Sequence, residues 1–125
     1  MTIQEALDHA DELRPNMMSR ELKIKHLSIL DGMIHHEIRM KHEHEEDCAC
    51  PEYNIDTDPA TVLLVPPPYD EDLYTAWLIS KVDLQNMEMD KYNNDRALFE
   101  NAYETMSDWW TRTHMPLSPV RFVRI

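Results

Sequence analysis

The chain has 125 residues, of which 24 are acidic and 12 are lysine or arginine, so its formal net charge is −12 at pH 7. A chain of this length folds as one domain around a single core, which excludes a large cleft between two lobes. The acidic excess repels nucleic-acid phosphates, and no local basic stripe offsets it, so we do not expect tight nucleic-acid binding.

The composition excludes several further classes of protein. Gly32 is the only glycine, whereas phosphate-binding loops and nucleophile elbows need several. No apolar run approaches the ~20 residues that span a bilayer, and the N-terminal residues lack a signal-peptide pattern. We therefore expect a protein made and kept in a cytoplasm, with no membrane partner. Cys48 and Cys50 are one residue apart, so we expect reduced thiols.

Two helices are predicted in the first third of the chain. Thr2 and Glu5 form a capping box ahead of a helix that runs to about Leu13. A second helix begins after Ser19 and continues through a histidine-rich stretch to about Glu46. The apolar positions of the first helix are Ile3, Ala6, Ala10 and Leu13. Those of the second are Leu22, Leu27, Leu30, Ile34 and Ile38, widened by Ile24, Ile29, Met33 and Met40.

Residues 47–68 read as a long arm between helices. Their prolines prevent a continuous helix, and residues 61–65 form the one run that favours a strand. Connections longer than about 12 to 15 residues are uncommon inside a domain unless they are functional or disordered. The sequence therefore predicts an arm with a short strand rather than a tight turn.

Two more helices are predicted after the arm. Asp70 is the expected N-cap of the third, whose apolar positions run from Leu73 through Val82 to Met89. Asn94 is expected to cap the fourth, which packs antiparallel to the third unless the break is only a kink. The apolar positions of the fourth helix are Ala97, Leu98, Phe99, Ala102, Tyr103, Met106, Trp109 and Trp110. The predicted fold is all-α: a four-helix domain over residues 1–116, with the arm and an extended tail over residues 117–125.

Surplus apolar residues point to contacts with other proteins. Trp109 and Trp110 are neighbours that cannot both face one core, so one is expected to point toward solvent, a crevice or another subunit. The tail alternates apolar and basic residues, so it either ties back onto its own domain or docks on a partner as an added strand, and docking on a partner is the favoured prediction. The candidates for subunit contacts are Trp109, Trp110, Met33 and Met40. Those for docking are Leu117, Val120, Arg121, Phe122, Val123, Arg124 and Ile125.

A metal site is the alternative that the sequence leaves open. Residues 35–50 contain six side chains that zinc accepts, namely His35, His36, His42, His44, Cys48 and Cys50. Their spacing matches no recognised zinc knuckle, so we predict no metal and no cofactor, and keep as the alternative a small cytoplasmic metal-binding or regulatory protein that uses this segment. The acidic runs read as solvated faces and helix caps, and no nucleophile motif is present. We predict no catalytic residue and no enzymatic activity.

Two stretches carry a resemblance to a known family. One is residues 92–100, Tyr-Asn-Asn-Asp-Arg-Ala-Leu-Phe-Glu, continued by Ala102-Tyr103, Trp109-Trp110, Arg112 and residues 113–116, Thr-His-Met-Pro. The other is residues 64–70, Leu-Val-Pro-Pro-Pro-Tyr-Asp, which lead into the third predicted helix. In these stretches the chain resembles the small head-to-tail connector, or adaptor, proteins of tailed phages and prophages of gut and other Gram-positive bacteria.

The resemblance implies a virion structural protein of the neck, assembled in the host cytoplasm. Such a subunit forms a ring of twelve copies below the portal, extends the DNA channel and offers a docking surface for stopper or tail-completion proteins. Its C-terminal tail, here residues 117–125, inserts into the portal protein. DNA passes through the channel without specific binding, and acidic walls suit that passage. The histidine- and cysteine-bearing stretch 42–50 departs from the family pattern.

Overall fold

The computed structural model describes residues 1–117 and confirms the predicted all-α class. Its helices are α1 (Ile3–Leu13), α2 (Arg20–Glu37), α3 (Glu71–Gln85) and α4 (Met89–Thr113), with a short 3-10 helix, η1 (Arg39–Lys41), after α2. No described helix is long and apolar enough to cross a membrane.

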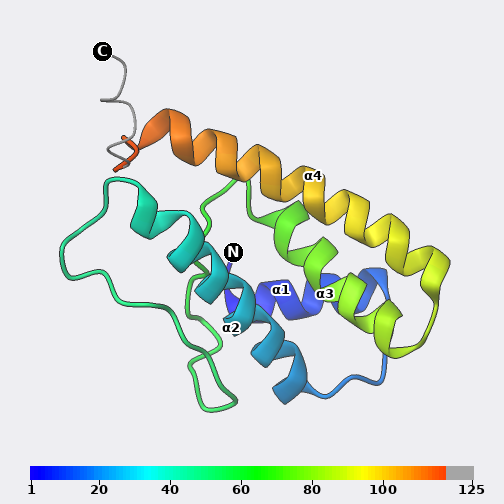
Figure 1. Cartoon of the computed structure of the whole chain (residues 1–125). Helices are drawn as coiled ribbons and strands as arrows, with labels where there is room; N and C mark the ends of the chain where they lie inside the picture. The colour runs from blue at the N-terminus through cyan, green and yellow to red at the C-terminus, as the bar shows by residue number, and fades with distance from the viewer. Residues whose placement is uncertain (118–125) are drawn as a thin grey trace.

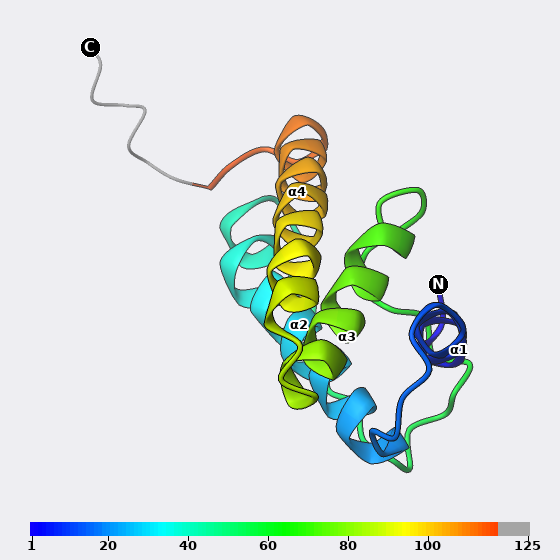
Figure 2. The ribbon, with the colours of Figure 1, turned by 90° about the vertical axis from the view of Figure 1, so that its right-hand side faces the viewer.

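Helix α3 lies at the centre of the molecule. It pairs with α4 in an antiparallel hairpin, and α1 and α2 pack on its other sides (Figures 1 and 2). Every residue from Leu73 to Ser80 is buried as a result. Helix α4 extends beyond the N-terminal end of α3 (Figure 1) and, at 1.5 Å per residue, is about 37 Å long. The largest fully buried apolar side chains are Ile3, Ile24, Leu27, Leu30, Ile34, Leu73, Tyr74, Leu78 and Met106.

Three helices begin where the sequence predicts. Thr2 and Glu5 form the expected capping box of α1, and the Ser19 hydroxyl accepts a hydrogen bond from the Leu22 backbone N–H at the start of α2. Asp70 caps α3 by accepting from the Glu71 N–H. These caps satisfy backbone donors that a helix leaves unpaired in its first turn.

The predicted end of α2 is wrong, because the helix ends at Glu37 and not near Glu46. After η1, the backbone of residues 41–43 pairs with the chain that follows α4. Leu117 donates to the Lys41 carbonyl at 2.9 Å, and Glu43 donates to the Met115 carbonyl at 2.8 Å. These long-range bonds draw the backbone out of the helical path.

The predicted start of α4 is also wrong. The helix begins at Met89, so residues 93–95 lie inside it, and Met89 does not belong to α3. The turn falls at residues 86–88 instead. Met87 adopts a left-handed backbone with φ of 59°, and the Glu88 N–H donates to the Asp83 carbonyl at 2.9 Å.

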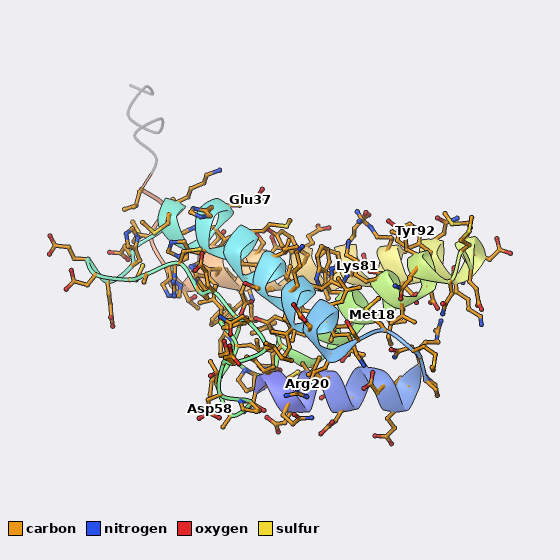
Figure 3. All side chains as sticks on the ribbon, turned by 90° about the horizontal axis from the view of Figure 1, so that it is seen from below. Met18, Arg20, Glu37, Asp58, Lys81 and Tyr92 are labelled. Atoms are coloured by element: carbon orange, nitrogen blue, oxygen red, sulfur yellow. The ribbon has the colours of Figure 1, made fainter. Side chains whose placement is uncertain are left out.

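The arm is held against the domain rather than extended into solvent. The Ile3 N–H donates to the Thr61 carbonyl at 3.0 Å, and the Leu63 N–H donates to the Met1 carbonyl at 2.9 Å. Thr2 and Val62 form a single isolated β-bridge in place of the expected short strand. Figure 3 shows Asp58 of the arm beside α1.

Candidate interaction site at the C-terminal end of α4

Four ring-bearing side chains form an aromatic cluster near the end of α4. Tyr69, just ahead of α3, stacks on Trp109 with ring centroids 5.1 Å apart. Trp109 meets Trp110 edge-on at 5.7 Å, and His114 stacks on Trp110 at 5.0 Å. Favourable ring pairs add about 0.5 to 1.5 kcal/mol each beyond the area they bury. The aromatic cluster therefore fastens the loop before α3 to the end of α4.

The two neighbouring tryptophans lie in different surroundings. Trp110 belongs to the core with 5% of its surface exposed, and its indole N–H has no hydrogen-bond partner. Trp109 is half-buried at the edge of the core, where Tyr69 covers one of its faces. Trp109 thus offers a partner more surface than Trp110 does.

The chain leaves α4 along the segment that follows η1. The Met115 N–H donates to the Glu43 carboxylate at 3.0 Å, and His42 and Pro116 form an antiparallel bridge. Figure 2 shows this segment leaving α4 on the side away from α1. Residues 115–117, which lead into the predicted tail, are therefore held by pairing with residues 41–43 of the same domain.

The other predicted contact residues are spread over the molecule. Met33 is half-buried and packs against the core, whereas Met40 is exposed, with its sulfur 3.8 Å from that of Cys48. Among the predicted docking residues, Leu117 is described and exposed. The remaining docking residues lie outside the described part of the chain: Val120, Arg121, Phe122, Val123, Arg124 and Ile125.

The histidine- and cysteine-bearing segment makes separate small contacts. His35 is buried and accepts a hydrogen bond from Arg39 at 3.0 Å, and burial, together with the arginine charge, lowers the pKa of His35. The Nε2 atom of His36 lies 3.6 Å from the Cys50 sulfur. Within residues 1–117, no group of three or more His, Cys, Asp or Glu side chains is arranged to hold a metal ion.

A groove of about 450 Å³ runs between α1, α3 and α4. We call it the α1/α3/α4 groove. The helices contribute His9 and Leu13 from α1, Asp72 and Ile79 from α3, and Leu98 and Ala102 from α4.

Two leucines of this groove, which the sequence analysis lists among the apolar positions of their helices, are exposed. Leu13 is 56% exposed and Leu98 is 61% exposed. Both keep the helical spacing of core positions, but α1 and α4 diverge across α3 and leave these positions open. The divergence of α1 and α4 depends on how the helices cross, so the helical spacing of apolar residues cannot predict it.

A buried pair of carboxyl groups lies at one end of the groove. Arg14, at the C-terminal end of α1, donates to the carboxylate of Asp83 on α3, and its second amino group lies 4.0 Å from Asp95 on α4. Burial and the neighbouring Asp83 raise the pKa of Asp95 to about 7. Perturbed carboxyl pairs occur in catalytic sites and in structural clusters alike. Here the pair and its arginine join three helices.

The sequence analysis missed this cluster because it assigned Asp95 to a helix break. An acidic residue four positions before an aromatic core residue, Phe99, was the available signal. Comparison of the chain with protein-family models, with curated proteins and with solved structures gave no match in any of the three.

Proposed function

We propose that the protein is a head-to-tail connector of a tailed phage, a ring-forming subunit that sits below the portal and extends the DNA channel. One observation carries the proposal. The two stretches that resemble connector proteins, residues 64–70 and 92–116, meet in the folded chain, where Tyr69 of one stacks on Trp109 of the other at 5.1 Å. Residues that share a local structural role are those that a protein family retains together.

The charge of the chain supports passage of DNA rather than its capture. A formal net charge of −12 gives the ring a strongly negative wall. Such a wall repels phosphates at close range and leaves the channel free of stable contacts. The proposed role of the protein is assembly, and the proposal includes no catalysis.

In the proposed mechanism the C-terminal tail docks on the portal. Residues 115–117 are extended and paired with residues 41–43, so the chain enters the tail in a conformation suited to adding a strand to a neighbour's sheet. Subunits of the ring meet through exposed apolar side chains such as Met40, and through Trp109 at the edge of the core. The opposite face of the ring receives stopper or tail-completion proteins.

The test is co-expression with the portal protein encoded in the same genome. We expect the chain to co-purify with a tagged portal and to add a ring of twelve copies below it, as seen by electron microscopy. A chain that ends after Pro116 should stay folded by circular dichroism and lose portal binding. Full retention of portal binding by that shortened chain would contradict the docking role of the tail, and absence of co-purification would contradict the proposed function.

A further inference from the structure

The α1/α3/α4 groove and the C-terminal segment match each other in chemistry. We propose that, before assembly, the groove of one copy holds residues 118–125 of a second copy. The proposal goes beyond the connector function, because it concerns the free protein and requires no portal. In this arrangement the apolar tail is covered until it binds the portal.

The groove offers apolar walls with acidic groups beside them. Leu13, Ile79 and Leu98 supply apolar surface, and Leu98 is 61% exposed when the groove is empty. Asp72 is exposed on the α3 wall, and the buried Asp95 lies at the α4 wall. Exposed leucines beside the exposed carboxylate of Asp72 favour a segment that is both apolar and basic.

The last eight residues have that composition. Val120, Phe122, Val123 and Ile125 are apolar, Arg121 and Arg124 are basic, and the segment contains no acidic residue, in a chain whose formal net charge is −12. In an extended segment alternate side chains face opposite ways, so Val120 and Phe122 can point into the groove while Arg121 points to its rim. Arg121 then lies within reach of Asp72.

The position at which the tail leaves the domain favours the groove of a second copy over the groove of the same copy. Leu117 is bonded to Lys41 in η1, on the side of α4 away from α1 (Figure 2). Leu98 lies about 22 Å back along α4 from Thr113, at 1.5 Å per residue. The groove lies between α1, α3 and α4, so a tail of the same copy would have to turn around α4 and run back along it, whereas the tail of a second copy can enter the groove directly.

The contact joins two different surfaces, a tail and a groove. Two copies satisfy both surfaces by exchanging tails, as in other swapped dimers. A variant with a damaged groove keeps a good tail, and a variant with a damaged tail keeps a good groove. This asymmetry allows a complementation experiment with full-length chains.

We would measure self-association of the full chain by sedimentation velocity over about 10 to 200 µM, the range of a modest interface. Leu98→Glu damages the groove, and Phe122→Glu damages the tail. Each variant alone should associate at least tenfold more weakly than the wild type. A mixture of the two should form a one-to-one heterodimer, because one intact tail meets one intact groove. Leu84→Glu is the matched control, since Leu84 is an exposed leucine of α3 outside the groove and its variant should associate like the wild type.

The location of the contact is read by crosslinking. A photoreactive phenylalanine analogue at position 122 should crosslink, between copies, to residues lining the groove. The proposal is overturned if the wild type remains monomeric over this range, if the mixed variants fail to associate, or if the crosslinks map elsewhere. Portal binding is measured separately, so such a failure leaves the connector function standing, and a failure of portal binding leaves the tail exchange standing.

Discussion

At the scale of single residues, Asp31 joins three parts of the fold through its hydrogen bonds. It is fully buried in α2 and accepts hydrogen bonds from the hydroxyls of Tyr53 and Tyr74, each at 2.5 Å, and from the backbone N–H of Leu64 at 3.0 Å. Burial raises the pKa of Asp31, and the three donors oppose that shift. A single carboxyl group thus joins α2, α3 and both halves of the arm.

Replacing Asp31 should be far more costly than replacing one of its donors. Asp31→Ala leaves two hydroxyls and one N–H without an acceptor, so we expect a loss of about 3 to 5 kcal/mol in the free energy of unfolding. Tyr53→Phe removes one donor and should cost about 1 kcal/mol. Urea unfolding followed by circular dichroism measures both. Equal losses in the two variants would show that Asp31 is not the centre of the network, and the exposed Asp47→Ala serves as control.

Asp95 makes the stability of the fold depend on pH. Its carboxyl group faces Asp83 of α3, Arg14 of α1 and Lys91 of its own helix, and its pKa rises from 3.8 to about 7. The folded state therefore binds a proton that the unfolded state releases. This contribution to stability is complete below about pH 4 and is lost as the pH rises toward about 7.

Asp95→Asn mimics the protonated side chain at every pH. Between about pH 5 and about pH 8 its free energy of unfolding should increase relative to that of the wild type, because only the wild type must hold a charged carboxylate beside Asp83. Chemical denaturation at several pH values gives this difference. A difference that stays constant with pH would contradict the raised pKa.

At the scale of helices and turns, the ends of the elements depend on distant partners. Helix α2 stops where residues 41–43 pair with residues 115–117, and the turn between α3 and α4 is set by Met87 in a left-handed conformation. Met87 is 81% exposed, so its side chain contributes little packing there. The turn carries a backbone cost that a glycine would avoid.

Met87→Gly should raise the free energy of unfolding by up to about 1 kcal/mol, because glycine adopts a positive φ without steric cost. Met89→Gly, two positions later in the first turn of α4, is the matched control and should lower it by a similar amount. Thermal and urea unfolding of the two variants and the wild type measure these changes in the free energy of unfolding. A loss of stability in Met87→Gly would show that the left-handed turn is not strained.

Gly32 lies in the middle of α2 with a negative φ, so its conformation does not require glycine. An added Cβ would meet the Cys50 sulfur at 3.9 Å, an ordinary contact distance. Gly32→Ala should therefore raise the free energy of unfolding by about 1 kcal/mol. A destabilised variant, measured by the same urea titration, would indicate that the arm packs on α2 more closely than this distance implies.

At the scale of the whole molecule, charge works against the compact state. The formal net charge of −12 is spread over a domain whose described ion pairs engage only a minority of the 24 acidic residues. Repulsion among the remaining carboxylates lowers the stability of the folded domain. The proposed ring of many copies would concentrate this charge further.

Added salt should stabilise the protein. Raising sodium chloride from about 0.05 M to about 0.5 M shortens the Debye length from roughly 14 Å to roughly 4 Å, which screens repulsion between exposed carboxylates. We expect the melting temperature to rise, as measured by differential scanning calorimetry. A fall would mean that the ion pairs, among them Arg14 with Asp83, outweigh the general repulsion.

Local patterns were enough to predict the all-α class and the starts of three helices. A cap such as Thr2, Ser19 or Asp70 acts on backbone donors within its own turn, and the apolar spacing of α3 reflects a helix buried on most sides. Interactions between residues that are close in the sequence can be predicted from the pattern of consecutive positions. Trp109 became a candidate contact residue because it neighbours Trp110, and Met40 because it widens the apolar face of the second predicted helix; both contact roles stay predictions.

The remaining features depended on residues far apart in the sequence. The end of α2, the network around Asp31, and the carboxyl pair of Asp83 and Asp95 each require partners from other elements. The α1/α3/α4 groove arises because helix crossing exposes Leu13 and Leu98, whose spacing is that of core positions. The sequence by itself determined which segments become helices, because that choice rests on neighbouring residues. Only the tertiary structure decided which helix faces remain open to a partner, because that depends on how whole helices pack.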